Sequence, residues 1–152
     1  MTPLWIVTLF ASLFALYLTI QIPKEEKFST EVAADVSATN FVAYRKAVQK
    51  YLEVNPGATG TISDASLASY WLPGYIRDAN WTNVISGGTL FVYSTTTLKH
   101  NTVNSIYIKS MKSSLVGIKN TGTGHLQSPN GFDTGVVLPA AIPNNALVIL
   151  GK

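Results

Sequence analysis

The hydrophobic positions at the start of the chain form one uninterrupted segment. Residues 3–22 are twenty consecutive positions without a charged side chain, and Lys24 carries the first charge in the sequence. As a helix this segment is about 30 Å long, which matches the hydrocarbon core of a bilayer. We therefore predict a transmembrane anchor over residues 1–23. The residues expected to hold it in the membrane include Pro3, Trp5, Phe10, Phe14, Tyr17 and Ile22.

Two alternatives compete with a retained anchor: a cleaved secretory signal and a helix buried in a soluble domain. Secretory signals begin with basic residues, have a shorter apolar run and end in small residues at the cleavage site. Here residues 1–2 carry no Lys or Arg, and residues 20–23 offer no pair of small residues. The rest of the chain is also too short to enclose an apolar helix on all sides. The pattern therefore favours an anchor that is not removed.

A second, amphipathic pattern follows the span. Pro23 is expected to close the span, and the two helical segments form either one bent rod or two joined elements. Ser29 is placed to cap a new helix, and Asn55-Pro56-Gly57 is placed to end it. Between these signals apolar residues recur at steps of three and four, at Ala34, Ala38, Phe41, Tyr44, Val48, Tyr51 and Leu52. This spacing predicts an amphipathic helix within residues 24–57. Its larger apolar residues are expected in the core, whereas Ala34 and Ala38 are also candidates for contact with a partner protein.

Residues 58–81 combine a short helix signal with a dense group of aromatic residues. Ser63 is placed to cap a short helix, with Ile62 and Leu67 forming a hydrophobic staple around it. The segment from Tyr70 to Ile76 then carries several large apolar side chains around a Pro-Gly turn, and Trp81 follows. Such a group closes the end of a core in most proteins. The alternative is an exposed surface that binds a partner through Trp71, Tyr75 and Trp81.

From Gly87 onward the hydrophobic period changes towards that of β-strands. Strands are predicted at Thr89–Ser94, Val103–Lys109, Ser114–Lys119, Phe132–Leu138 and Ala146–Leu150, with a loop at Asn120–Asn130. Short links predict an antiparallel meander, in which Phe132–Leu138 is an edge strand and the fully apolar Ala146–Leu150 is central. The predicted fold class is therefore α+β: an N-terminal transmembrane helix, then an amphipathic helix packed on an antiparallel sheet. Residues 58–152 form the globular part.

Composition excludes several classes of function. The chain has 152 residues, of which only 12% are charged, and it contains no cysteine, so disulfides and thiolate metal sites are absent. The net charge of +3 is spread along the sequence and not clustered. A nucleic-acid groove requires clustered Lys and Arg residues with interleaved aromatics, so we expect no nucleic-acid partner.

Candidate catalytic and ligand-binding residues are few. His100 and His125 lie in loop-like stretches without a partner at helical or hairpin spacing, and we expect both to be solvated. Asp64, Asp78 and Asp133 each stand beside a turn or a helix start, where capping explains a carboxylate. We therefore expect a protein that is not an enzyme, with no catalytic residue, no metal site and no cofactor.

The order of these elements resembles that of type IV pilins. Thr61–Leu67, Tyr70–Tyr75 and Asn80–Asn83, followed by Gly88–Tyr93, look like the short helix, Leu-Pro corner, Asn and strand of the type IVb pilins of conjugative thin pili. Two pilin features are missing: a Gly directly before the apolar helix and a Glu at the fifth position within it. With an apparently unprocessed anchor, the chain is similar to the PilM family of small inner-membrane proteins that accompany the thin-pilus apparatus.

This resemblance implies a structural part of the pilin-export apparatus or pilus basal body, with a single membrane span and the C-terminal domain in the periplasm of a bacterium. The expected partners are the lipid bilayer and other pilus-assembly proteins or pilins, and self-association is open. Because charge is sparse, these contacts are expected to be mainly apolar and little affected by salt. The alternatives are a minor pilin incorporated in the fibre, and an exported carbohydrate-binding module that uses Trp71, Tyr75 and Trp81 as stacking platforms.

Overall fold

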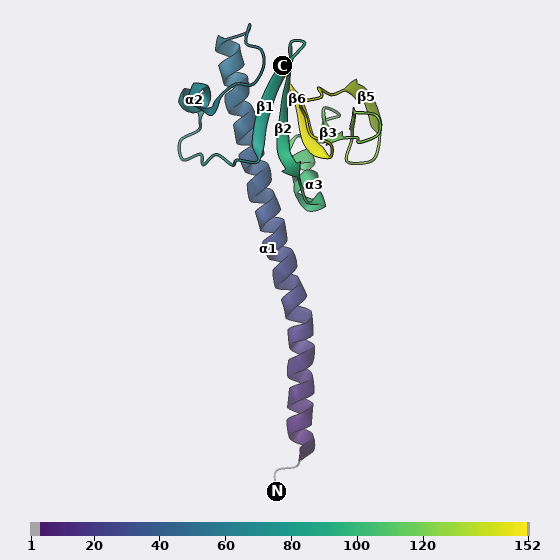
Figure 1. Ribbon diagram of the computed structural model, residues 1–152. Coiled ribbons are helices and arrows are strands. Elements are labelled where there is room, and N and C mark those ends of the chain that lie inside the picture. The colour runs from purple at the N-terminus through teal and green to yellow at the C-terminus, as the bar shows by residue number, and fades with distance from the viewer. Residues whose placement is uncertain (1–3, 152) are drawn as a thin grey trace. The chain divides into compact units, whose positions relative to one another are not determined.

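The computed structural model describes residues 4–151, without the side chains of residues 20, 22 and 23. The predictions made for Pro3 and for the side chain of Ile22 lie outside the described residues. The chain divides into two compact units, one ending at Ala33 and the other beginning at Ala34. Figure 1 labels the elements.

The first unit consists of the N-terminal part of helix α1, which runs without interruption over Leu4–Val54. The prediction that Ser29 caps the start of a new helix was therefore wrong. Of the two alternatives left open at Pro23, one rod or two joined elements, the structure has one continuous helix. A proline removes one backbone donor, and the strong helix formers of residues 24–27 continue the helix beyond that gap. The apolar part of α1 has a mean hydropathy of 1.9 and none of it is buried, so by length and composition this helix can cross a membrane.

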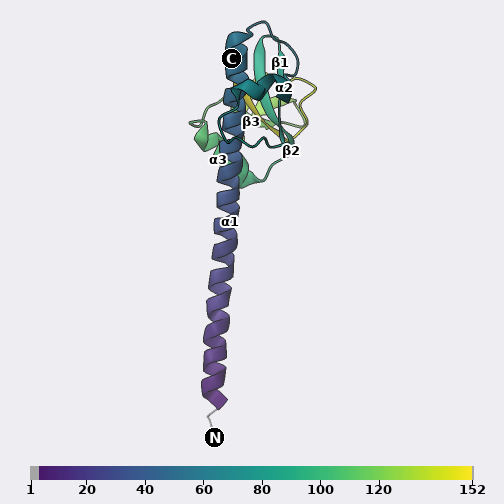
Figure 2. The same ribbon diagram turned by 90° about the vertical axis from the view of Figure 1, so that its left-hand side faces the viewer.

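In the second unit, one stripe of α1 packs on the sheet. Its side chains are Ala34, Ala38, Phe41, Tyr44, Ala47 and Val48, each no more than 2% exposed. Of these, Ala38, Phe41, Tyr44 and Val48 share a hydrophobic cluster with strand residues such as Leu90, Val92 and Ile149. The views in Figures 1 and 2 both place this part of α1 against the sheet. The predicted amphipathic stripe is thus confirmed as core.

The second unit contains one antiparallel sheet of six strands in the order β1-β2-β6-β3-β4-β5. The strands are β1 Trp81–Ser86, β2 Thr89–Thr97, β3 Val116–Lys119, β4 His125–Gln127, β5 Asp133–Val137 and β6 Ala146–Gly151. The predicted α+β class is confirmed, as are the edge position of β5 and the central position of β6. The simple meander was wrong, because β6 inserts between β2 and β3.

Two strands, β1 and β4, were missed. Strand β1 forms a hairpin with β2 through Gly87 and Gly88, whose positive φ angles of 58° and 75° fit a two-residue turn. The Gly-Gly pair between two apolar runs was a signal for this hairpin. Strand β4 has three residues and lies inside the segment predicted as a loop.

The predicted strand at Val103–Lys109 is instead helix α3, His100–Lys109. Val103 and Ile106 are buried, whereas Ile108 is 54% exposed. Tyr107 packs at the edge of the same cluster. The buried positions therefore follow the spacing i, i+3, i+4 of a helix, which in so short a segment was mistaken for the alternation of a strand.

The short helix predicted at Ser63 is confirmed as α2, Asp64–Leu67, which continues into the 3-10 turn η1 at Ala68–Tyr70. The Ser63 hydroxyl accepts a hydrogen bond from the backbone N–H of Ser66, as expected of an N-cap. Ile62 and Leu67, the two residues of the predicted staple, are both buried in the core that includes α1.

Both faces of the central strands are covered. On β2 and β6, alternate residues such as Val92 and Ile149 face the α1 side, whereas Phe91 and Val148 belong to a second cluster with Leu138 and Ile142. This explains why β6 is apolar at consecutive positions. The second cluster is closed by Lys119, which is only 7% exposed. Its ammonium group donates to the carbonyls of Pro139 (3.1 Å) and Ile142 (2.7 Å).

A fully buried asparagine joins three elements. The Asn83 carbonyl oxygen accepts from the Ile62 N–H at 2.9 Å, and its amide nitrogen donates to the Ile62 carbonyl at 3.0 Å and to the Tyr44 hydroxyl at 2.8 Å. The side chain therefore ties β1 to α1 and to the segment before α2. A buried polar group of this kind stabilises a fold only while all of its partners are present.

We predict that Asn83→Ala lowers the free energy of unfolding by about 3 kcal/mol, because it leaves buried partners without a hydrogen bond. The neighbouring, half-buried Thr82 provides the control, since Thr82→Ala is expected to cost less than about 1 kcal/mol. Urea unfolding of the full chain in mild detergent, followed by tryptophan fluorescence, measures both. Equal losses for the two variants would show that Asn83 has no special role.

Candidate interaction surface

The outer side of α1 in the second unit carries an apolar groove. Two adjoining pockets of about 390 and 330 Å³ share Thr39 and Ala43, and we call them together the helix groove. The groove is lined by Asp35, Val36, Thr39, Asn40, Val42, Ala43, Lys46, Leu72, Gly74, Tyr75, Ile76 and Lys109. From Asp35 to Lys46 it follows about 17 Å of helix. This length corresponds to about three turns of a helix.

Small side chains are common to both pockets of the helix groove, and exposed apolar side chains, which we call its rim, also line it. Thr39 and Ala43 are the shared small residues, and side chains of this size allow another backbone to approach closely. Val36, Leu72 and Ile76 are 63%, 45% and 82% exposed. Aliphatic side chains that gather around a concave surface indicate a site of protein contact more strongly than single exposed residues do.

The wall of the groove at residues 74–76 is fixed to α1 by Asn40. The Asn40 amide nitrogen donates to the Ile76 carbonyl at 2.7 Å. Its carbonyl oxygen accepts from the Tyr75 hydroxyl at 3.0 Å and from the Trp81 indole N–H at 2.9 Å. Burial raises the pKa of Tyr75 to about 12, so the phenol keeps its proton and remains a donor at neutral pH. These hydrogen bonds hold the wall against α1.

The aromatic residues around this wall stack on one another and do not form an open platform. The rings of Trp71 and Tyr75 are stacked at 5.0 Å, and Trp71 also lies 5.7 Å from the ring of Tyr44. Trp81 is fully buried and packs edge-on against Phe41 at 4.8 Å. Three coplanar exposed rings, as a carbohydrate-binding module would require, are therefore not present at Trp71, Tyr75 and Trp81.

The structure places the predicted partner-contact residues in two groups. Ala34, Ala38 and Trp81 are at most 2% exposed and are packed within the second unit, so they offer no surface to another protein. Trp71 and Tyr75 are half-buried, and Tyr75 lines the helix groove. Sequence reasoning missed the groove residues themselves, because Val36, Thr39 and Ala43 form a weak stripe next to the stronger buried one. The signal available for the groove was Val36, a valine on a polar face of the helix.

Charge at the helix groove is sparse and mainly basic. Asp35 and Lys109 form an ion pair at 2.9 Å between α1 and the end of α3. Lys46, at the other end of the groove, is exposed and has no ion-pair partner among the described residues. Behind the wall, Arg77 pairs with Asp64 and donates to the Trp81 carbonyl at 3.1 Å. The groove itself therefore has one unpaired positive charge.

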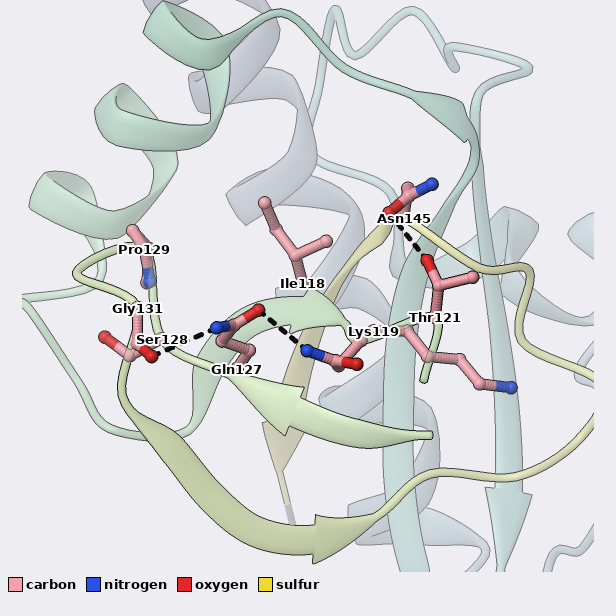
Figure 3. Close-up of a pocket in the computed structure, with 9 residues that line it drawn as sticks. Ile118, Lys119, Thr121, Gln127, Ser128, Pro129, Gly131 and Asn145 are labelled. Atoms are coloured by element: carbon pink, nitrogen blue, oxygen red, sulfur yellow. Dashed lines mark hydrogen bonds between the residues drawn. The ribbon is translucent and has the colours of Figure 1, made fainter. Parts of the chain in front are cut away.

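A separate pocket of about 400 Å³ lies at the ends of β3 and β4, and most of its lining residues carry neutral polar groups (Figure 3). Gln127 accepts from Asn120 at 3.1 Å and donates to the Gly131 carbonyl at 3.0 Å. Thr121 donates to Asn145 at 3.2 Å. These side chains mainly satisfy one another, and the ammonium group of Lys119 is bonded to backbone carbonyls. The pocket therefore presents no strong acid, base or charge for chemistry.

The histidines and the three candidate carboxylates occupy surface positions. His125 has a partner, which the sequence did not predict: its Nδ1 lies 3.1 Å from a carboxylate oxygen of Asp133. A hydrogen bond from the Gly135 N–H, helped by His125, holds the pKa of Asp133 below its usual range. His100 is the first residue of α3 and is exposed.

The expected turn and cap positions of the three carboxylates are confirmed. Asp64 opens α2, while Asp78 and Asp133 accept from backbone N–H groups two residues further on, at 2.9 Å in both cases. Among the described residues, no group of three or more His, Asp or Glu side chains is arranged to hold a metal ion.

Comparison with known proteins gives one family and one solved structure. The model of the PilM family matches residues 7–150 of this chain. A crystal structure of the protein PilM from Escherichia coli B7A has a TM-score of 0.60 and 24% sequence identity, covering 79% of this chain and 92% of that one. At this identity the likeness shows the fold. A comparison with curated protein sequences found no match.

The family match covers both the apolar helix and the sheet, and the solved structure has the same fold. This agrees with the resemblance drawn from the corner and strand residues of the sequence. The chain therefore belongs to the PilM family, and with it to a pilus-related system.

Proposed function

We propose that this protein is a non-catalytic assembly subunit of a type IV, thin-pilus apparatus, held in the bacterial inner membrane by its N-terminal span. The observation that carries the proposal is the exposed apolar part of α1 in a member of the PilM family. An apolar helix that is nowhere buried needs another apolar environment, and a bilayer supplies it.

The second unit is the part that meets other proteins in this proposal. It has its own core, so it does not need the span to be buried. The helix groove supports a docking role because small side chains line both of its pockets and exposed apolar side chains form its rim. The partner that fits it best is an amphipathic helix of another pilus-assembly protein, with its apolar face towards Thr39 and Ala43.

We propose a periplasmic location for this unit. The sequence of the second unit is sparsely charged and free of cysteine, which suits an exported domain. Lys24 and Lys27 would then lie on the periplasmic side of the membrane, at variance with the positive-inside rule.

We predict that Val36→Glu reduces co-purification with the other pilus-assembly proteins about tenfold or more, because it places a charge in the apolar rim. Val36 is 63% exposed, so the variant should fold normally. Co-expression of the apparatus and affinity purification of the full chain in mild detergent give the measurement.

Val137→Glu is the matched control, since Val137 is 71% exposed on the edge strand β5, away from the groove residues. It should leave co-purification unchanged. If both variants recover the same partners in wild-type amounts, the helix groove is not the docking surface. Recovery of no assembly protein by the wild type would reject the role in assembly.

A minor pilin is the second candidate, and the continuity of α1 favours it. One helix of 51 residues combines an apolar N-terminal part with a C-terminal part packed on a sheet. This is the arrangement by which the sequence resembles pilins. A pilin, however, is cleaved before its apolar helix and enters the fibre, whereas an anchored assembly subunit keeps residues 1–22 and remains in the membrane.

We predict that the protein recovered from membranes begins at residue 1 or 2 and that a C-terminal tag is digested when spheroplasts are treated with protease. N-terminal sequencing and immunoblotting provide the two readouts. A shortened, methylated N-terminus would favour the minor pilin. A tag that resists protease until the membrane is opened would place the second unit in the cytoplasm.

A further inference from the structure

The two ends of the helix groove differ in charge. Asp35 lies at one end and is paired with Lys109 at 2.9 Å. Lys46 lies at the other end, eleven residues further along α1, and is exposed without an ion-pair partner among the described residues. The groove therefore has one end that is neutralised within the chain and one end that is not.

The surroundings of the Lys46 end contain no acid that could compensate it from the sheet or from α3. Residues 79–132 include no Asp or Glu but four lysines, and one of these, Lys109, lines the same pocket as Lys46. Two ammonium groups thus border this pocket, with Asp35 as the partner of only one. An anionic group placed there would be attracted by Lys46 at no cost to the existing pair.

We propose that the helix docked in the groove is acidic and amphipathic, with a carboxylate that pairs with Lys46. This inference rests on the proposed function and specifies its partner. An apolar stripe on that helix would face Val36, Leu72 and Ile76, and its carboxylate would lie at the end nearest Lys46. A helix whose C-terminus points towards Lys46 would add the negative end of its dipole to the same attraction.

The ionic contact makes docking sensitive to salt. Apolar contacts change little with ionic strength, but a rim ion pair is screened over about 8 Å at physiological salt. Steering by such a pair acts mostly on the rate of association. The proposal therefore differs from the sequence-based expectation of binding little affected by salt: raising the salt concentration should weaken the wild-type complex and have little effect on the complex of Lys46→Gln.

Zero-length carbodiimide cross-linking of the full chain, co-expressed with the other pilus-assembly proteins in membranes, tests the proposal. The expected product joins Lys46 to an Asp or Glu within an amphipathic helix of one assembly protein. Lys46→Glu should reduce complex formation about tenfold, and exchanging the cross-linked carboxylate for lysine should restore it. Lys99→Glu is the matched control: Lys99 is exposed and precedes α3, outside the groove lining, so its change should stay within about twofold.

Three results would overturn the proposal that the docked helix is acidic. They are a Lys46 cross-link only to a second copy of this chain, equal effects of Lys46→Glu and Lys99→Glu, and equal salt dependence of the wild type and Lys46→Gln. If Val36→Glu still abolishes docking in any of these cases, the groove retains its role and only the charge of the partner is wrong. If Val36→Glu has no effect either, the proposed function fails as well.

Discussion

The burial of one helical stripe is the interaction on which the rest of the second unit depends. Ala38, Phe41, Tyr44 and Val48 pack in one hydrophobic cluster with residues of β1, β2 and β6. Removing α1 would expose one whole apolar face of the sheet to water, at about 25 cal/mol for each Å². The helix is therefore an integral part of the core, and only its outer side remains for other proteins.

Local sequence signals predicted the elements whose stabilising contacts are also local. The long amphipathic stripe, the Ser63 cap and the apolar strand at residues 146–150 were confirmed. The errors arose where distant contacts decide the structure. In α3 the segment is too short for its period to be certain, and burial of Val103 and Ile106 selects the helix. The insertion of β6 between β2 and β3 is a pairing of segments far apart in sequence, for which no pattern within either strand exists.

The candidate site was harder to predict than the fold because exposure, and not residue type, defines it. A cluster of aromatic residues indicated a corner but could not show that Trp81 is enclosed while Tyr75 forms a wall. The decisive residue is Asn40, whose three hydrogen bonds hold the wall in place. In the sequence Asn40 is one polar residue within a helix. Its role requires Tyr75, Ile76 and Trp81 to return to α1, and only the tertiary structure shows that they do.

The modest size of the helix groove is consistent with partners that share a membrane. In solution, a contact through a few aliphatic residues and one ion pair would be weak, since association must overcome the loss of translational and rotational freedom. Two proteins anchored in one bilayer have already lost much of that freedom, so their domains meet at a high effective concentration. In the proposed role, the apolar span would thus allow a small groove to suffice. The low affinity of the groove for its partner would also let the complex dissociate and reassemble while the pilus system operates.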